Sequence, residues 1–280
     1  ANLYAYRAVV GGSQTWQDNL IAIVINLLIA AYFWNVLKEN WRTLQESDAF
    51  VEIRRLYRFI WVLYGLLMMV YGAQQALSYA FNMPSNVLGE VGREIAVNAI
   101  ALLLIGSPIW FYFWRLLQNA LPDSAEKESY LRLGILYLLS LAGVIVFLTA
   151  SGNFIYIILL QILGEGATWQ EFIRQLGGPI SVAVPFGVIW AYYNKWLSQQ
   201  FDFDENLPRR AGKQRLYSYI LSFLGLTATV IGLLTLFSVL IDLVLENMYL
   251  SESGIREPLA GALATLAVGL PIWLISWRPL

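Results

Sequence analysis

The chain has 280 residues, of which 58% are hydrophobic and 13% are charged, and its formal net charge is −1. Soluble domains have roughly 45–50% apolar and 25% charged residues, so this composition indicates a membrane protein. The net charge argues against a nucleic-acid partner and a broad polybasic lipid-binding surface. The sequence contains no cysteine and no histidine, which excludes disulfides and removes the usual ligands of zinc, copper and haem. We therefore expect no cofactor and no metal.

Seven apolar segments follow one another along the chain, each long enough to cross a hydrocarbon layer of about 30 Å as a helix. Their apolar runs lack the alternating pattern of barrel strands, and a backbone in lipid must satisfy its own hydrogen bonds. The sequence therefore predicts an all-α fold, a polytopic transmembrane helical bundle forming one transmembrane domain over residues 1–280. The expected spans are 18–38, 56–81, 95–116, 131–162, 178–198, 216–246 and 258–277.

Internal similarity predicts that the chain was built by duplication. Residues 93–115 and 256–278 align without a gap and share 11 of 23 positions, and the 18-residue segments that begin at Arg55 and Arg215 share 8. The two offsets agree closely, which predicts parallel repeats of a two-helix hairpin of about 80 residues. The expected units are 1–45 (incomplete, its first helix missing), 54–118, 128–200 and 213–280.

The amino-terminal residues also enter this interpretation. Asn2–Val10 resemble the end of a helix whose beginning is absent, so we expect a parent protein with eight spans that lost the first one. A removed signal peptide, or an N-terminus that simply varies, is the alternative. Lys and Arg concentrate in 38–58, 115–132 and 195–215, which predicts that these loops are cytoplasmic. This distribution places the N-terminus outside and the C-terminus inside an inner membrane of bacterial type.

Three prolines and one acid are the candidates for a functional role within the spans. Pro108, Pro185 and Pro271 each remove a helical hydrogen bond and predict a kink, which serves either a solute pathway or ordinary packing. Asp242 is the one ionisable residue expected within a span, at shallow depth. It is either a functional acid or a side chain that reaches the interface.

Other residues indicate packing and anchoring. Small residues allow close helix approach in lipid, so glycines seven residues apart predict a packing seam. Trp and Arg near a helix end are typical of interfacial anchors, with an aromatic cation site as the alternative. The seam comprises Gly65, Gly72, Gly225 and Gly232, and the anchors are Trp110, Trp114, Arg115, Trp273, Trp277 and Arg278. The outward pairs that begin at Arg93 and Arg256 fit either helix-dipole stabilisation or a polar gate.

The alternation of two helix types resembles a bacterial family of repeat membrane proteins, the domain of unknown function 5671. The resemblance rests on RLYSYI from Arg215 and on Pro271, Trp273, Trp277 and Arg278, with echoes from Arg55 and Pro108. It covers nearly the whole chain and implies no activity and no catalytic residue.

No phosphate loop, metal cluster or nucleophile with an adjacent base is evident in the sequence, so we expect a protein that is not an enzyme. The expected function is an accessory or scaffold subunit of a larger bacterial membrane assembly, with membrane lipids and other membrane-protein subunits as partners and no nucleic acid. The alternative is a transporter or channel for a small solute, with its pathway at the kinked helices. A polar cavity would favour transport, and an apolar, tightly packed interior would favour the scaffold.

Overall fold

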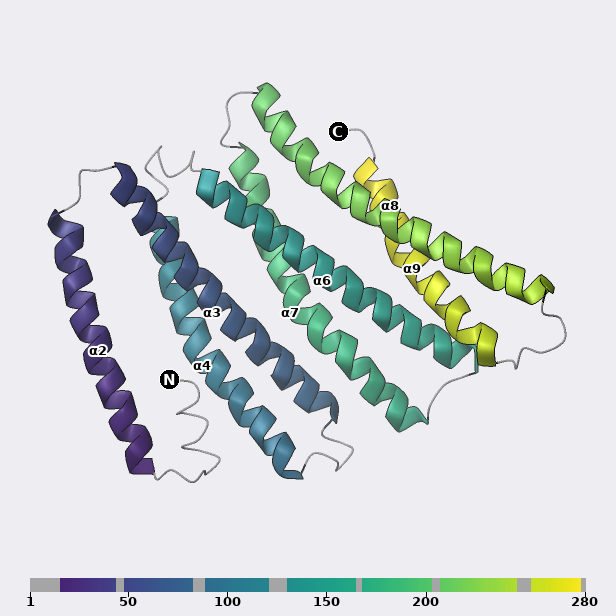
Figure 1. The fold of residues 1–280 in the computed structure, drawn as a ribbon, viewed down its shortest axis with the longest axis horizontal. Coiled ribbons are helices and arrows are strands. Elements are labelled where there is room, and N and C mark those ends of the chain that lie inside the picture. Colours follow the sequence, from purple (N-terminus) through teal and green to yellow (C-terminus); the bar gives the residue numbers. More distant parts are fainter. Residues whose placement is uncertain are drawn as a thin grey trace. The chain divides into compact units, whose positions relative to one another are not determined.

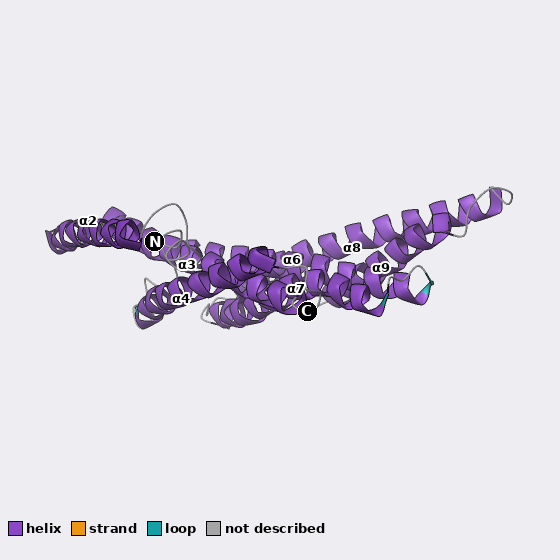
Figure 2. Cartoon of the chain, turned by 90° about the horizontal axis from the view of Figure 1, so that it is seen from below, coloured by secondary structure: helices purple, strands orange, loops and turns teal. Residues whose placement is uncertain are grey.

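A computed structural model describes residues 16–43, 48–82, 89–120, 130–164, 168–202, 207–245 and 253–277. Every secondary-structure element in these ranges is a helix (Figure 2). The elements are α2 (Trp16–Thr43), α3 (Asp48–Asn82), α4 (Gly89–Asn119), α6 (Tyr130–Ile162), α7 (Trp169–Asp202), α8 (Leu207–Leu245) and α9 (Ser253–Trp277), drawn in Figure 1. The predicted all-α class is therefore confirmed for the described part of the chain.

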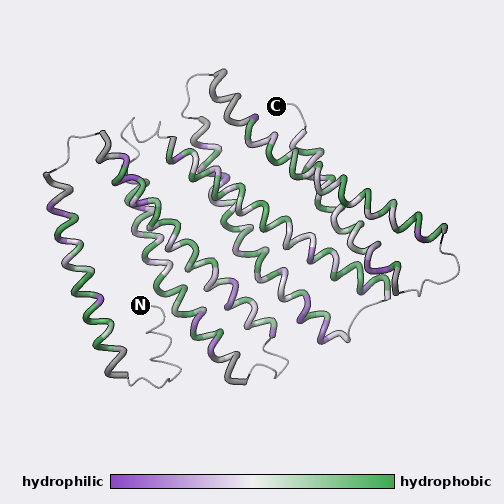
Figure 3. The backbone as a smooth tube through the Cα atoms, in the orientation of Figure 1, coloured by the Kyte–Doolittle hydropathy of each residue, from purple (hydrophilic) through white to green (hydrophobic). Residues whose placement is uncertain are grey.

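Seven of the described helices are long and apolar enough to cross a membrane. Figure 3 shows the apolar colour running along most of each helix, with polar residues gathered towards the helix ends. A span needs about 20 apolar residues, and the helices have 25 to 39 residues. The chain is a multi-pass membrane protein.

All seven described helices begin before the spans predicted for them. Helix α7 begins at Trp169 rather than at 178, and α9 begins at Ser253 rather than at 258. Pro179 lies inside α7. The amphipathic turn that precedes it is helical, with Arg174 donating to Glu171 at 3.1 Å. Proline is tolerated inside membrane helices because neighbouring groups can satisfy the freed carbonyl.

The chain forms two compact units, Ala1–Glu126 and Lys127–Leu280, and each is described by itself. In the first unit α3 and α4 pack along each other. Trp61 of α3 stacks on Phe113 of α4 with ring centroids 5.6 Å apart. Helix α2 makes no extensive contact with the other described helices, and from Leu20 to Glu39 none of its side chains is buried.

The second unit contains two closely packed pairs, α6 with α7 and α8 with α9. Helix α6 also packs on α9, and this contact joins the two pairs. The core of the unit contains Leu136, Val144, Tyr193 and Leu197, each at most 2% exposed. The α6–α9 contact is the one that positions the candidate site, because a cleft opens beside it.

Candidate functional site

The three packed helix pairs share one close backbone contact. A Cβ built on Gly65 of α3 would lie 2.7 Å from the backbone nitrogen of Trp110 in α4. A Cβ on Gly225 of α8 would lie 2.6 Å from the same atom of Trp273 in α9. In the α6–α7 pair, Gly143 stands 3.0 Å from the backbone nitrogen of Trp190. Each helix pair is therefore in contact at a point where only glycine fits without a shift.

This shared contact provides a register for comparing the three pairs. In the pairs α3–α4, α6–α7 and α8–α9, the residue ten positions after the contact glycine is Gln75, Asn153 and Thr235, respectively. In the same order, the residue twelve positions before the contact tryptophan is Asn98, Gly178 and Gly261. The duplication itself remains a prediction from the sequence, but the register follows from the contacts alone.

The α3–α4 pair is joined at these positions by a hydrogen bond. The Asn98 Nδ2 donates to Gln75 Oε1 at 2.7 Å. The other two pairs have glycine in place of Asn98, and a Cβ on Gly178 or Gly261 would meet nothing within 4 Å. Open space therefore lies where the first pair has an amide.

That open space belongs to two cavities of the second unit. The larger, about 420 Å³, is a cleft between α6, α8 and α9, and the smaller, about 310 Å³, lies between α6 and α7. Ile145, Thr149 and Asn153 of α6 line both, so this stripe is the ridge between them. Gly261 lines the cleft and Gly178 lines the smaller cavity. Cavities of roughly 300–1,000 Å³ have the size of small-molecule sites.

The cleft is apolar along most of its lining, and no described residue that lines it is charged. Thr149 and Thr265 donate their hydroxyls to carbonyls of their own helices, those of Ile145 and Gly261, at 2.9 and 2.8 Å. Their methyl groups are therefore what they add to the surface. Asn153 is exposed, and its amide makes no hydrogen bond within the part of the chain that the structure describes.

One polar contact joins helices beside the cleft, and an arginine lies near the end of α6. The hydroxyls of Ser140 in α6 and Tyr217 in α8 are 3.0 Å apart, and Ser140 is fully buried. At the other end of α6, Gly164 has a φ of 83°, and its Cβ position lies 3.5 Å from Arg256 Nη1. A guanidinium at a helix C-terminus is stabilised by the helix dipole. The choice between helix-dipole stabilisation and a polar gate for the outward pairs stays a prediction, and the side chain of Arg93 lies outside the described residues.

The three predicted prolines do not meet at a site. Pro108 and Pro271 are exposed on their helices, whereas Pro185 is buried in α7. None of them lines either cavity; the proline that does is Pro179. The register also separates Pro185 from the others, since it precedes its tryptophan by five residues rather than two.

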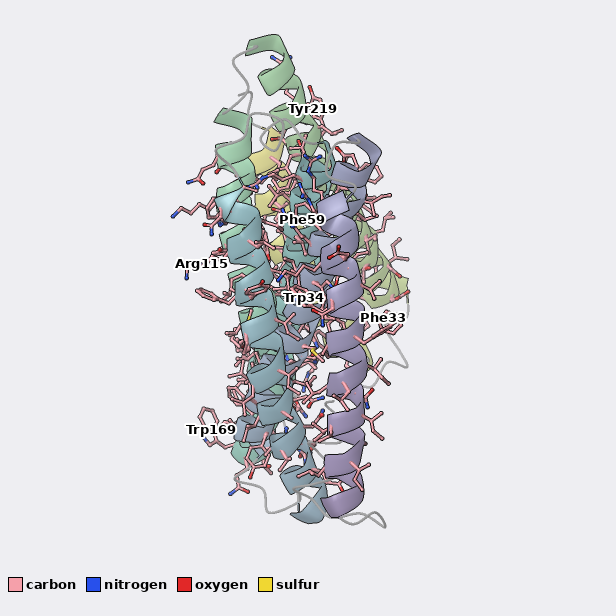
Figure 4. All side chains as sticks on the ribbon, turned by 90° about the vertical axis from the view of Figure 1, so that its left-hand side faces the viewer. Phe33, Trp34, Phe59, Arg115, Trp169 and Tyr219 are labelled. Atoms are coloured by element: carbon pink, nitrogen blue, oxygen red, sulfur yellow. The ribbon has the colours of Figure 1, made fainter. Side chains whose placement is uncertain are left out.

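The predicted acid and anchors lie at the surface or within the helix pairs. Asp242 is exposed on α8 and lines neither cavity. Arg115 projects from α4 (Figure 4) and Trp277 is 68% exposed, as anchors require. Trp114, in contrast, is buried and stacks on Trp110 with centroids 6.3 Å apart, which is a packing position. Trp273 provides the backbone contact with Gly225, and Arg278 lies outside the described residues.

Sequence reasoning missed Asn153. The residue stands in the small-residue run TASGNF and was not among the candidates within the spans. The register that relates Asn153 to Gln75 rests on contacts between helices, which the sequence alone does not supply. No group of three or more His, Cys, Asp or Glu that could hold a metal ion occurs among the described residues.

Comparison with known proteins found no match among curated proteins and none among solved structures. A family model does match, over residues 55–188 and 215–280, and its description is Domain of unknown function (DUF5671). The two matched segments begin at Arg55 and Arg215, the residues that open the paired RLY motifs. Because these segments cover well over half of the chain, the protein belongs to the DUF5671 family.

Proposed function

We propose that this protein is a non-enzymatic accessory or scaffold subunit of a larger bacterial membrane assembly. The observation that supports this most directly is α2, a membrane-length helix with no buried side chain between Leu20 and Glu39. Its exposed surface includes Tyr32, Phe33 and Trp34, which are 65%, 58% and 44% exposed, and Figure 4 shows Phe33 projecting from the helix. Membrane helices associate through close side-chain packing, so such a helix offers a surface to another subunit.

The interior of the described chain also supports a structural role. The paired helices are in backbone contact at Gly65, Gly143 and Gly225, which leaves no room for a path between the helices of a pair at these points. The two cavities have mostly apolar linings without a charged residue, and Pro271 is not among the residues that line them. A pathway for a polar solute would need polar groups along it. The proposal includes the inner membrane as location, with the loops between hairpins on the cytoplasmic side.

Native-membrane extraction in mild detergent, followed by native gel separation and mass spectrometry, tests the proposal. We expect stoichiometric co-migration with other membrane subunits. A photoreactive amino acid at Leu28, which is 66% exposed on α2, should form a covalent link to one of them. The same amino acid at Val62, which is fully buried, is the matched control and should form none. Migration of the chain alone, with Leu28 labelling lipid only, would contradict the proposal and return transport as the leading hypothesis.

A further inference from the structure

Asn153 is a polar group with an open site on either side. Its counterpart Gln75 is bonded across the helix pair to Asn98, whereas the α6–α7 pair has Gly178 at the position of Asn98, with no side chain to offer. The amide lines both the cleft and the smaller cavity. An unpaired amide away from water costs about 1–3 kcal/mol. A ligand with an oxygen that accepts a hydrogen bond from this amide therefore gains a hydrogen bond that the fold itself does not make.

The depth of Asn153 follows from the end of its own helix. Arg256 lies beside Gly164, and a guanidinium at the end of a membrane helix reaches for the headgroup level. Asn153 precedes Gly164 by eleven residues. At 1.5 Å per residue this is roughly 16 Å along the helix, about half of a hydrocarbon layer of about 30 Å. Asn153 therefore lies near the middle of the membrane.

The shape and chemistry of the cleft set the kind of occupant. From Gly261 to Ile272 it follows α9 for roughly 16 Å, at 1.5 Å per residue. Val268 and Leu224 add apolar surface, and the two threonine hydroxyls are already bonded within their helices. The occupant must therefore be mostly apolar and uncharged, with an oxygen that accepts or shares one hydrogen bond.

We infer that the cleft between α6, α8 and α9 binds a long-chain quinone, with a ring carbonyl oxygen accepting a hydrogen bond from Asn153 Nδ2. A quinone has uncharged carbonyl oxygens on a flat apolar ring, and its tail makes it dissolve in the middle of the bilayer. A glycerolipid brings only hydrocarbon to that depth, because its ester oxygens stay near the headgroups. The inference concerns binding and assigns no electron transfer to the protein.

The test uses the full chain in nanodiscs of phosphatidylethanolamine and phosphatidylglycerol, with a photoreactive azido-quinone as the probe. Mass spectrometry of the labelled peptides locates the site. We expect labels to concentrate on α6 around Asn153 and on α9 around Val268. Unlabelled quinone should compete, and a long-chain prenyl alcohol without a carbonyl should compete less.

Four variants distinguish the contribution of the Asn153 amide to quinone labelling from that of the open space in the cleft. Asn153→Leu keeps the size of the side chain and removes the amide, so labelling should fall about five-fold, the worth of one net hydrogen bond. Gly178→Asn places an amide opposite Asn153, as in the α3–α4 pair, and should lower labelling by occupying it. Gly261→Leu fills the cleft and should abolish labelling. Gly134→Leu is the matched control, because its Cβ also meets nothing within 4 Å and it lines neither cavity, and it should label as the parent does.

Helical content by circular dichroism and elution volume establish that each variant folds. If Gly261→Leu does not fold, Val268→Phe narrows the same cleft from the other end. Equal labelling of Asn153→Leu and the parent protein would overturn the inference. Labels spread evenly over the exposed helix surface would also overturn it. So would a glycerolipid that competes with the probe as well as unlabelled quinone does. The purified chain is used without partner subunits, so the result is independent of the proposed accessory role.

Discussion

The close contact between α8 and α9 allows the stability cost of a single methyl group to be worked out. In Gly225→Ala, the added Cβ would lie 2.6 Å from the Trp273 nitrogen and 3.0 Å from its Cα. Ordinary contact begins at 3.4 Å, so the helices must separate by about 0.8 Å. A gap of about 0.5–1 Å forfeits a quarter to a half of the dispersion energy of the contacts it opens.

Overpacking of this kind costs about 1–3 kcal/mol. Replacing glycine by alanine gains about 1 kcal/mol of helix propensity, so we expect a net loss of up to about 2 kcal/mol. The neighbour here is backbone and cannot rotate away. In Gly232→Ala the nearest atom is the Leu266 Cγ at 2.9 Å, a side chain that can move, so the loss should be smaller.

Gly261→Ala completes the series as the matched control. Its Cβ meets nothing within 4 Å, so we expect no loss and up to about 1 kcal/mol of gain. Unfolding by sodium dodecyl sulfate in mixed micelles, followed by circular dichroism, measures the three free energies under one condition. If Gly225→Ala were as stable as Gly261→Ala, the close approach of α8 and α9 would be refuted.

Three further predictions concern polar residues. In a double-mutant cycle, Gln75→Leu and Asn98→Leu should show a coupling of about 0.6–1.7 kcal/mol in the same unfolding assay, since one hydrogen bond joins them, and additive effects would contradict the 2.7 Å contact. Ser140→Ala and Tyr217→Phe should each cost about 1 kcal/mol. The double variant should lose at most a few tenths of a kcal/mol more than the larger single loss. Asp242→Asn removes a charge that is exposed on α8. It should leave unfolding and native-gel migration unchanged, and loss of a measured solute flux in vesicles would instead revive transport.

The helices could be predicted from the sequence because apolar length alone determines which segments cross a membrane. Their ends could not, since the amphipathic turns of α7 and α9 carry charges that a hydropathy pattern assigns to loops. The start of α7 is an example: Glu171 and Arg174 lie within the helix and pair with each other, before the apolar run begins. A hydropathy pattern does not distinguish such charged helical turns from loops.

The candidate site could be predicted less well, because in a membrane protein the same residue types serve both helix packing and ligand binding. Gly225 and Gly261 are both helical glycines in small-residue stripes, yet one meets a backbone at 2.6 Å and the other meets nothing. Only the partner helix distinguishes them. Asn153 was missed for the same reason, since its meaning depends on the absence of a side chain at Gly178, 25 residues away in the sequence.

The same glycine–tryptophan backbone contact recurs in the three helix pairs of the described chain, and two of these pairs have open space at a second level. The glycine-tryptophan contact sets the distance between the helices of a pair at one level, whatever the residues at other levels. At the level of Asn98, the α3–α4 pair has an amide that is hydrogen-bonded to Gln75. The other two pairs have Gly178 or Gly261 at this position, and a Cβ there would meet nothing within 4 Å. The missing side chains therefore coincide with the cavities, since Gly178 lines the smaller cavity and Gly261 lines the cleft that we propose as a ligand site.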